Sequence, residues 1–245
     1  MPRGSGALAG YKSREFYGLL VGLVSFLLVW APAPAFLAAL AALCYGMARE
    51  LEKALNEPGL AYGSVLSLAA FLVAPPLGLT VAALTALYEG YRRWRLERFF
   101  KSFFLNFYPP FFLSYLYPVY EDGLLLVLLA AVFAQDVAAY YAGRRLGRRP
   151  LFPKLSPKKT VEGFLAGLTA GTAAGLLLLQ AEPAAALKLV AVLTVAVAGD
   201  YFKSFIKRQL GLKDFSNLLG EHGGLTDRFD ALTFAAPVFY LLFGS

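Results

Sequence analysis

The chain has 245 residues, of which 58% are hydrophobic and 16% are charged, and its mean hydropathy is +0.59. This composition excludes an ordinary water-soluble domain and indicates an integral membrane protein. The formal net charge of +7 suits anionic lipid headgroups and nucleotide phosphates as partners, whereas nucleic acid is a poor partner because little soluble surface remains. The single cysteine, Cys44, can form no disulfide within the chain.

Apolar runs that end at charges, prolines or glycines predict nine membrane-spanning helices. The predicted spans are 16–30, 33–48, 60–74, 77–90, 108–119, 123–142, 161–180, 184–201 and 229–243. Several are shorter than the roughly 20 residues that cross a bilayer, so flanking residues must complete them or the membrane must thin locally. In 108–119, Pro109, Pro110 and Pro118 would break a regular helix, so a re-entrant segment is the alternative there.

Basic residues segregate to alternate connections between these runs. The N-terminus and the connections 49–59, 91–107, 143–160 and 202–228 carry 3, 2, 5, 7 and 5 Lys or Arg, which is 22 of the chain's 23. The positive-inside rule then places the N-terminus in the cytoplasm and the C-terminus outside. We therefore predict an all-α integral membrane protein with about nine transmembrane helices and a basic cytoplasmic face.

A polar stretch at 199–230 lies between two long apolar runs, and we expect the chemistry there. We predict that the helix of 184–201 continues to Gly211, a residue suited to a helix C-terminus. Positions i, i+4, i+7 and i+8 then share one face, and they hold Asp200, Ser204, Lys207 and Arg208. Such a face could bind a divalent metal and phosphate oxygens. A solvated helix extension is the alternative.

A glycine-bearing loop follows, and the last predicted helix begins after it. This segment holds Gly220, His222, Gly223, Gly224, Asp227 and Asp230. Glycines let a backbone approach a phosphate closely. Asp227 and Asp230 are three residues apart, so with Asp200 they could surround Mg²⁺ and leave coordination sites for substrate phosphates. The alternative is that these aspartates only cap the helix and interact with its dipole.

A second group of polar residues lies upstream, where Asp136, Tyr140 and Arg144 recur at i, i+4 and i+8. Asp136 is about two turns inside the membrane, so it should face the protein interior with a partner, either Arg144 or a bound cation. A structural ion pair is the alternative.

The segment after this group predicts the start of another helix, with Ser156 as N-cap and Pro157 in the first turn. Lys158 and Lys159 would then oppose the positive end of the helix dipole, which makes sense if an anion is bound there.

At these residues the chain resembles the phosphatidate cytidylyltransferases, also called CDP-diacylglycerol synthases. The family's C-terminal signature matches in order and spacing at Ser204, Lys207-Arg208, Lys213-Asp214, His222-Gly223-Gly224, Asp227-Arg228 and Asp230. Upstream, the matching residues are Asp136, Tyr140, Gly143, Arg144, Gly147, the run 156–160, Glu162-Gly163 and Gly199-Asp200. The resemblance covers about 130–230. We therefore divide the chain into N-terminal membrane helices, 1–120, and a catalytic membrane region, 121–245.

Three positions depart from the family pattern. Lys203 stands where glutamate is usual, Val161 where tryptophan is frequent, and Gly220-Glu221 where Pro-Gly usually precedes the histidine. The reversed charge at Lys203 removes that position from our predicted metal ligands.

The resemblance implies transfer of CMP from CTP to phosphatidate in phospholipid biosynthesis, with Mg²⁺ required and room for a second cation. The implied metal ligands are Asp200, Asp227, Asp230 and Asp214. The implied catalytic residues are Asp227, Asp200, Lys207, Arg208 and His222. The implied substrate-binding residues are Ser204, Lys213, Arg228, Gly223, Gly224, Lys158, Lys159 and Arg144, and Asp136 with Glu162 form a second wall. The family also implies a prokaryotic inner membrane with the active site facing the cytoplasm, and a homodimer is compatible with the sequence.

Two other classes of function remain as alternatives. A secondary transporter would explain the intramembrane carboxylates, but no repeat of the 199–230 pattern occurs in 1–120. A CTP-dependent enzyme acting on another lipid, such as a prenol or ether-lipid phosphate, or a lipid kinase, would share the same polar residues.

Overall fold

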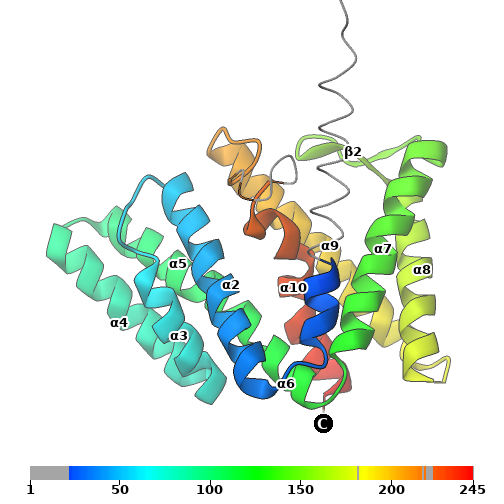
Figure 1. Ribbon diagram of the computed structural model, residues 1–245. Helices are drawn as coiled ribbons and strands as arrows, with labels where there is room; N and C mark the ends of the chain where they lie inside the picture. Colours follow the sequence, from blue (N-terminus) through cyan, green and yellow to red (C-terminus); the bar gives the residue numbers. More distant parts are fainter. Residues whose placement is uncertain (1–21, 181, 217, 219–222, 245) are drawn as a thin grey trace, which may run out of the picture. The chain divides into compact units, whose positions relative to one another are not determined.

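The computed structural model describes residues 22–180, 182–216, 218 and 223–244 (Figure 1). Its helices are α2 (Ala33–Ala54), α3 (Tyr62–Val73), α4 (Pro75–Arg93), α5 (Leu96–Ser114), α6 (Leu116–Glu121), α7 (Leu125–Leu146), α8 (Val161–Leu179), α9 (Ala185–Gln209) and α10 (Leu225–Phe243), and residues 22–28 are also helical. Within the described residues the only strands are β1 (Pro150–Phe152) and β2 (Ser156–Thr160). The all-α prediction is confirmed.

The helices form two compact units, which we describe separately. Unit 1 comprises the chain up to Ser114 together with Leu212–Phe229, and unit 2 comprises Tyr115–Gly211 together with Asp230–Ser245. Helix α10 therefore contributes its first turn to unit 1 and the rest of its length to unit 2.

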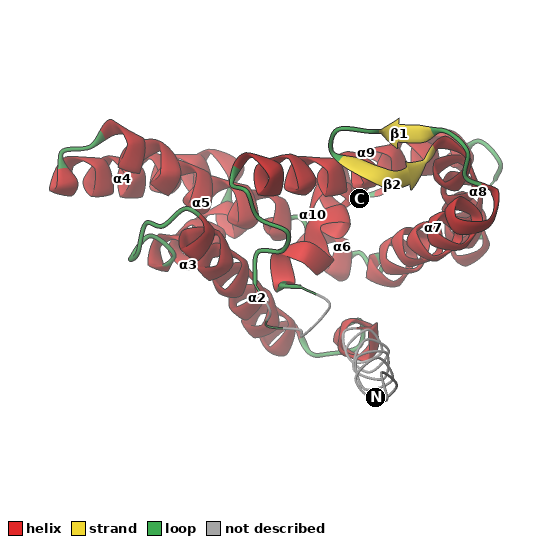
Figure 2. Cartoon of the chain, turned by 90° about the horizontal axis from the view of Figure 1, so that it is seen from above, coloured by secondary structure: helices red, strands yellow, loops and turns green. Residues whose placement is uncertain are grey.

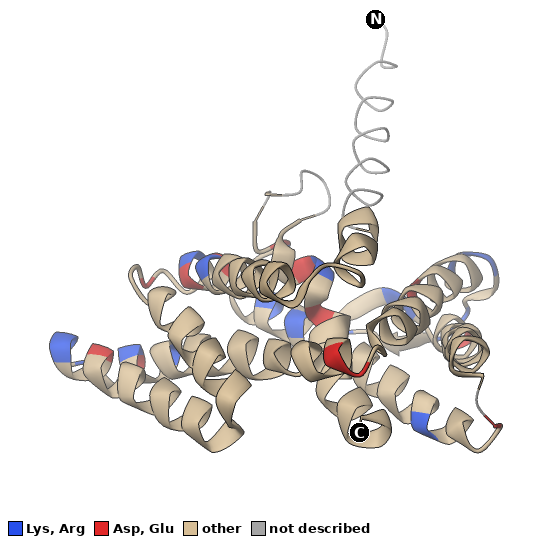
Figure 3. Cartoon of the chain, turned by 60° about the horizontal axis from the view of Figure 1, so that its bottom comes forward, with Lys and Arg blue, Asp and Glu red and all other residues tan. Residues whose placement is uncertain are grey.

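Four of the described helices, α2, α7, α8 and α9, are long and apolar enough to cross a membrane, and α3 is a shorter apolar helix. Charged residues lie mostly near the helix ends and leave long uncharged stretches between them, as Figure 3 shows. The length and composition of these helices support an integral membrane protein.

Helix α5 corrects the expected break at the prolines of 108–119. Pro109 and Pro110 both lie inside the helix, which continues to Ser114. Aromatic rings stack along it on both sides of the prolines, with centroids 5.8 Å apart for Phe103 and Phe107 and 5.0 Å apart for Phe107 and Phe111. This packing offsets the lost backbone hydrogen bonds. Pro118 lies in the first turn of α6, where a missing N–H costs little.

A buried ion cluster holds the helix ends of unit 1 together. The Arg98 side chain on α5, 3% exposed as a residue, lies between Glu57 before α3 and Glu89 on α4, with N–O distances of 2.7 Å to each. Burial alone would raise the pKa of the Glu57 carboxyl, but hydrogen bonds from Arg98 and Lys101 outweigh it and lower that pKa below its ordinary value.

In unit 2, α7 and α8 lie side by side along their length (Figures 1 and 2). Four buried glycines four residues apart make this approach possible: Gly163, Gly167, Gly171 and Gly175. A Cβ built on Gly167 would be 2.8 Å from the Gln135 carbonyl oxygen of α7, and one on Gly171 would be 2.7 Å from that of Ala131. Small residues at this spacing let two membrane helices pack backbone to backbone.

The β-hairpin corrects the predicted helix start at Ser156. Strands β1 and β2 pair antiparallel, with Phe152 opposite Ser156, and helix α8 begins only at Val161 (Figure 2). The helix cap is Thr160, whose Oγ1 accepts a hydrogen bond from Gly163 N at 3.1 Å. The residue before a proline prefers an extended conformation, so Ser156 is better suited to a strand than the capping pattern indicated. Phe152 packs edge-on against Tyr201 of α9, with ring centroids 4.4 Å apart.

We predict that Gly167→Ala destabilises the protein by about 1–3 kcal/mol, because the added methyl group meets a backbone carbonyl that cannot move aside easily. The measurement is thermal unfolding in detergent. Ala173→Leu adds more atoms at an exposed position of the same helix and should leave the melting temperature nearly unchanged. An equal loss in both variants would contradict close packing at Gly167.

We predict that Arg98→Met lowers the stability at pH 7 by about 3–5 kcal/mol, because it removes the buried cation that Glu57 and Glu89 share and leaves them only more exposed partners. The folded-state pKa of Glu57 lies below its ordinary value of 4.5. Its contribution is therefore present above pH 4.5 and is lost as the pH falls through the lower folded value.

The measurement is the melting temperature of both proteins as a function of pH. Arg92→Met is the matched control, because Arg92 also pairs with Glu89, at 3.1 Å, but is largely exposed. If Arg92→Met were as destabilising as Arg98→Met, burial of the cluster would not be the cause.

Candidate active site

Unit 2 brings charged residues from three elements together. Asp200 on α9 forms ion pairs with Lys159 of β2 and with Lys203 of α9, the latter at 3.2 Å. Lys203 also pairs with Asp230 of α10. The predicted grouping of Asp200 with Asp230 is thus present around one lysine, and the hairpin contributes the second cation.

Lys203 is the residue that sequence reasoning set aside. It is 7% exposed and Asp230 is 4% exposed, so the two charges neutralise each other away from solvent. A buried charge persists only when it is paired, and here one ammonium group serves two carboxylates. The available signal was the three-residue spacing from Asp200, which puts both side chains on one helical face.

The predicted second wall is partly correct. Asp136 of α7 lies within electrostatic range of Lys159, Asp200, Asp230 and Lys203. Among the cations that act on Asp136, Lys159 has the largest electrostatic effect, whereas the sequence predicted Arg144 or a bound cation as the partner. Arg144 lies two turns along α7, where its Nη1 is 3.4 Å from the Tyr140 hydroxyl.

Glu162 and Lys158 lie at the edge of this group. The Glu162 carboxylate accepts hydrogen bonds from the backbone N–H groups of Arg148 and Arg149, at 3.0 and 3.3 Å, and so holds the turn after α7. Lys158 is exposed on β2. Neighbouring residues of a strand point to opposite faces, which explains why Lys159 and not Lys158 pairs with Asp200.

The predicted polar face of α9 is helical throughout. Ser204 and Lys207 are half-buried and Arg208 is exposed near the C-terminal end. Gly211 has φ +68°, the left-handed conformation expected of a residue that follows a helix end. The helix therefore presents its carboxylate about two turns before its cations, as the spacing predicted.

In unit 1, the loop before α10 is organised around Asp227. Its Oδ2 accepts hydrogen bonds from Phe215 N at 3.0 Å and from Gly224 N at 3.1 Å. The structure therefore shows Asp227 in the helix-capping role that was the alternative to metal binding. Gly223 has φ +79°, which a residue with a side chain rarely adopts.

The other predicted residues of this loop lie at its edges. Lys213 is exposed, Asp214 is half-buried, and Arg228 is exposed on α10. His222, Gly220 and Glu221 lie outside the described residues.

Glu50 of α2 is a buried acid that sequence reasoning missed. Its carboxylate accepts hydrogen bonds from Leu225 N and Thr226 N, both at 2.8 Å, and from the Ser216 hydroxyl at 2.6 Å. A Cβ built on Gly224 would lie 2.3 Å from Glu50 Oε1, so this glycine allows the carboxylate to approach. No sequence signal marked Glu50, because its neighbours Arg49, Glu52 and Lys53 look like ordinary membrane-flanking charges.

The carboxylates fit the requirements of Mg²⁺, which binds through one or two carboxylates together with water and substrate phosphates. Asp200 and Asp230 carry carboxylate oxygens of this kind in unit 2, and Asp227 carries them in unit 1. Among the described residues, no group of three or more His, Cys, Asp or Glu side chains could hold a metal by itself.

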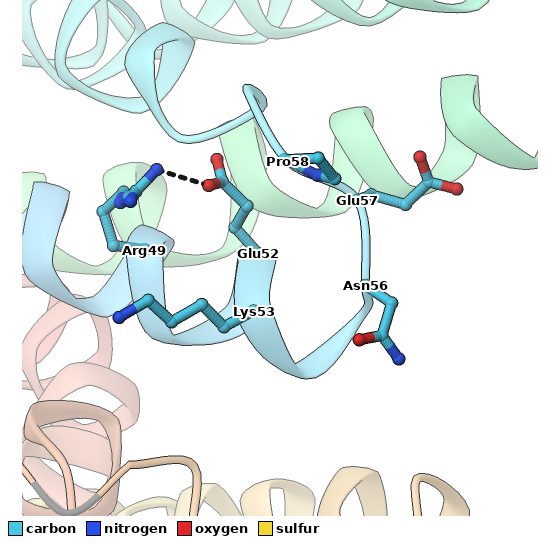
Figure 4. Close-up of a pocket in the computed structure, with 6 residues that line it drawn as sticks. All are labelled: Arg49, Glu52, Lys53, Asn56, Glu57 and Pro58. Carbon is cyan, nitrogen blue, oxygen red and sulfur yellow. Dashed lines mark hydrogen bonds and ion pairs between the residues drawn. The ribbon is translucent and has the colours of Figure 1, made fainter.

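Unit 1 also contains an open pocket of about 370 Å³ (Figure 4). It is lined by Arg49, Glu52, Lys53, Asn56, Glu57 and Pro58, and an Arg49–Glu52 ion pair of 2.5 Å lies along it. None of the predicted site residues lines this pocket, so the candidate site rests on the charged groups described above.

Comparison with known proteins gives a consistent result. A sequence model of the cytidylyltransferase family matches residues 12–245. The chain is 51% identical over 233 residues to a phosphatidate cytidylyltransferase of Aquifex aeolicus, covering 94% of this chain and 90% of that protein. It is 39% identical over 132 residues to a phosphatidate cytidylyltransferase of Pseudomonas aeruginosa, covering 49% and 47% of the two chains. One from Thermotoga maritima is 34% identical over 150 residues, with 56% of each chain covered. The protein therefore belongs to the cytidylyltransferase family.

Proposed function

We propose that the protein transfers CMP from CTP to phosphatidate, giving CDP-diacylglycerol and pyrophosphate in phospholipid biosynthesis. The observation that carries this proposal is the 51% identity, over nearly the whole chain, to a protein named phosphatidate cytidylyltransferase. The apolar helices agree with a lipid substrate, and the paired charges on α9, α10 and β2 agree with a reaction between two polyanions.

The reaction joins two phosphates. A phosphate oxygen of phosphatidate attacks the α-phosphorus of CTP, the bond from that phosphorus to the bridging oxygen breaks, and pyrophosphate leaves with the electron pair. Phosphatidate already carries an anionic oxygen, so neutralising charge matters more than a strong general base.

Basic side chains would hold the substrate phosphates. On α9, Lys207 and Arg208 lie about two turns after Asp200, so phosphates bound to them would lie beside the carboxylate. Lys213 and Arg228 would neutralise the departing pyrophosphate. Lys158 is exposed on the hairpin and could contact either substrate, whereas Lys159 already pairs with Asp200.

We propose that Asp200, Asp227 and Asp230, assisted by Asp214, hold Mg²⁺. When bound, the cation would stabilise the charge that develops on the phosphates. Lys203 already neutralises the half-buried Asp200 and the buried Asp230, so the two aspartates can lie together before substrate arrives. Oδ2 of Asp227 accepts hydrogen bonds from two backbone N–H groups, which hold the carboxylate in one orientation.

We further propose nine membrane spans with a cytoplasmic N-terminus, so that the basic connections and 199–230 face the cytoplasm. The segregation of 22 of 23 basic residues supports this topology. CTP would then arrive from the basic face, and the acyl chains would enter laterally from the bilayer of a prokaryotic inner membrane.

The activity is tested by incubating purified protein in detergent with labelled CTP, phosphatidate and Mg²⁺. We expect a CMP-bearing lipid and pyrophosphate. If only CDP and a phosphorylated alcohol form, the protein is a lipid kinase; if only a prenol or ether-lipid phosphate reacts, the lipid class proposed here is wrong.

We predict that Asp227→Asn lowers turnover by at least about 10²-fold while the protein stays folded. The reason is that a neutral amide would hold Mg²⁺ poorly, so the negative charge that develops on the phosphates in the transition state would lose its stabilisation. The measurement is kcat at saturating Mg²⁺ beside the melting temperature. Asp122→Asn, at an aspartate outside the proposed site, should keep the wild-type rate. A near-normal rate for Asp227→Asn would remove Asp227 from the metal ligands.

We predict that Lys203→Met makes folding depend on Mg²⁺, because the buried Asp230 and the half-buried Asp200 lose their shared cation, a change that costs about 3–5 kcal/mol. The melting temperature should fall in EDTA and recover as Mg²⁺ is added, by a larger increment than in the wild type. Lys207→Met, one turn along the same helix, is the control. If Mg²⁺ raised the melting temperature equally in all three proteins, Lys203 would not be taking the position of a bound cation.

A further inference from the structure

We propose that Glu50 is a positioning residue that sets the orientation of the Asp227 carboxylate. The inference deepens the proposed function and rests on it. It assigns part of the active site to α2, a helix in the region 1–120, outside the stretch 130–230 that holds the sequence motifs.

The contacts of Glu50 define an anion site at a helix N-terminus that the protein fills itself. The first N–H groups of a helix have no partner within the helix and attract negative charge. In α10 these groups include Leu225 N and Thr226 N, and both donate to the Glu50 carboxylate at 2.8 Å. With Glu50 5% exposed, these two N–H groups are already engaged by a buried carboxylate. These two N–H groups are therefore not available to substrate phosphates.

The same carboxylate holds both sides of the loop that fixes Asp227. Asp227 Oδ2 is bound by Phe215 N and Gly224 N, and Glu50 binds the next residue after each of them, Ser216 and Leu225. A shift of either segment away from Glu50 would also move a donor away from Asp227. Glu50 thus acts on Asp227 through the backbone of these two segments.

Two glycines allow α2 and the start of α10 to come this close. A Cβ on Gly46, one turn before Glu50, would lie 2.5 Å from Leu225 Cδ1. A Cβ on Gly224 would lie 2.3 Å from Glu50 Oε1. Contacts this short exclude any larger residue without a shift of the neighbours. The approach of Glu50 to the loop is therefore built into both segments.

Helix α2 also offers a matched control. Glu52 is 2% exposed, and its Oε2 accepts hydrogen bonds from Leu60 N at 2.8 Å and Ala61 N at 2.7 Å, at the start of α3. Glu50 and Glu52 are thus buried acids, two residues apart, that each bind two backbone N–H groups at a helix start. Only Glu50 binds residues next to the donors of Asp227.

The test compares Glu50→Ala and Glu50→Gln with Glu52→Ala and Glu52→Gln, as full-length protein in detergent. Melting temperature reports the structural loss, and kcat and KM for CTP are measured at a temperature where each variant is folded. We expect comparable losses of melting temperature at the two positions. We expect kcat to fall by about 10²-fold in Glu50→Ala, the size of effect that a misplaced site residue causes, with KM changed much less. The Glu52 variants should keep kcat within about twofold of the wild type, since stability alone does not enter the rate of folded enzyme.

Glu50→Gln keeps the shape and one acceptor oxygen, so it should recover part of kcat, and it carries the test if the alanine variant does not fold. The inference is overturned if both Glu50 variants keep the wild-type kcat, or if the Glu52 variants lose kcat equally. Those results would leave the proposed function intact, because the wild type would still make the CMP-bearing lipid. A wild type that makes no such lipid would overturn the proposed function and this inference with it.

Discussion

A carboxylate buried among apolar helices must be neutralised or hydrogen-bonded, and much of this structure follows from how that is done. Glu50 and Glu52 bind backbone N–H groups at helix starts, whereas Glu57 and Asp230 are paired with Arg98 and Lys203. Each of these contacts joins one helix or loop to another, and the contacts of Glu50 join segments more than 160 residues apart. The hydrogen bonds and ion pairs of these acids therefore determine which helix ends lie next to each other.

The proposed chemistry uses the same constraint. Lys203 lets Asp200 and Asp230 lie together in unit 2, and the backbone donors around Asp227 keep that carboxylate in one orientation in unit 1. Oxygen ligands for a metal are then prepared in advance, which lowers the reorganisation needed when two polyanionic substrates arrive. The glycine face of α8 serves a different purpose, since it lets helices pack closely without any polar contact.

Much of the local structure could be predicted because it depends on neighbouring residues. The extension of α9 to a glycine stop, its polar face, and the helical start at Asp227 all follow from spacing and capping preferences. Predictions failed where a distant segment prevailed over the local signal. Ser156 was expected to begin a helix, but pairing with β1 makes it part of a strand.

The charged residues also differ in whether their role depends on neighbouring residues or on distant segments. Lys203 differs from the family pattern, and only its contacts with Asp200 and Asp230 show that a cation belongs there. Glu50 lies among charges that look like membrane-flanking residues, and its partners are about 170 residues away along the chain. A hydrogen bond across such a separation leaves no periodic pattern in the sequence.

By itself, the sequence determined the membrane class, most of the helix positions and the resemblance to the phosphatidate cytidylyltransferases, and it predicted the stretch in which we propose the chemistry. These depend on composition, hydrophobic runs and motif spacing, all of which are local. Only the tertiary structure decided which cation pairs with which aspartate, that β2 supplies Lys159, and that α2 supplies Glu50. The physical reason is that a buried charge takes its partner from whichever element the fold brings within hydrogen-bonding distance.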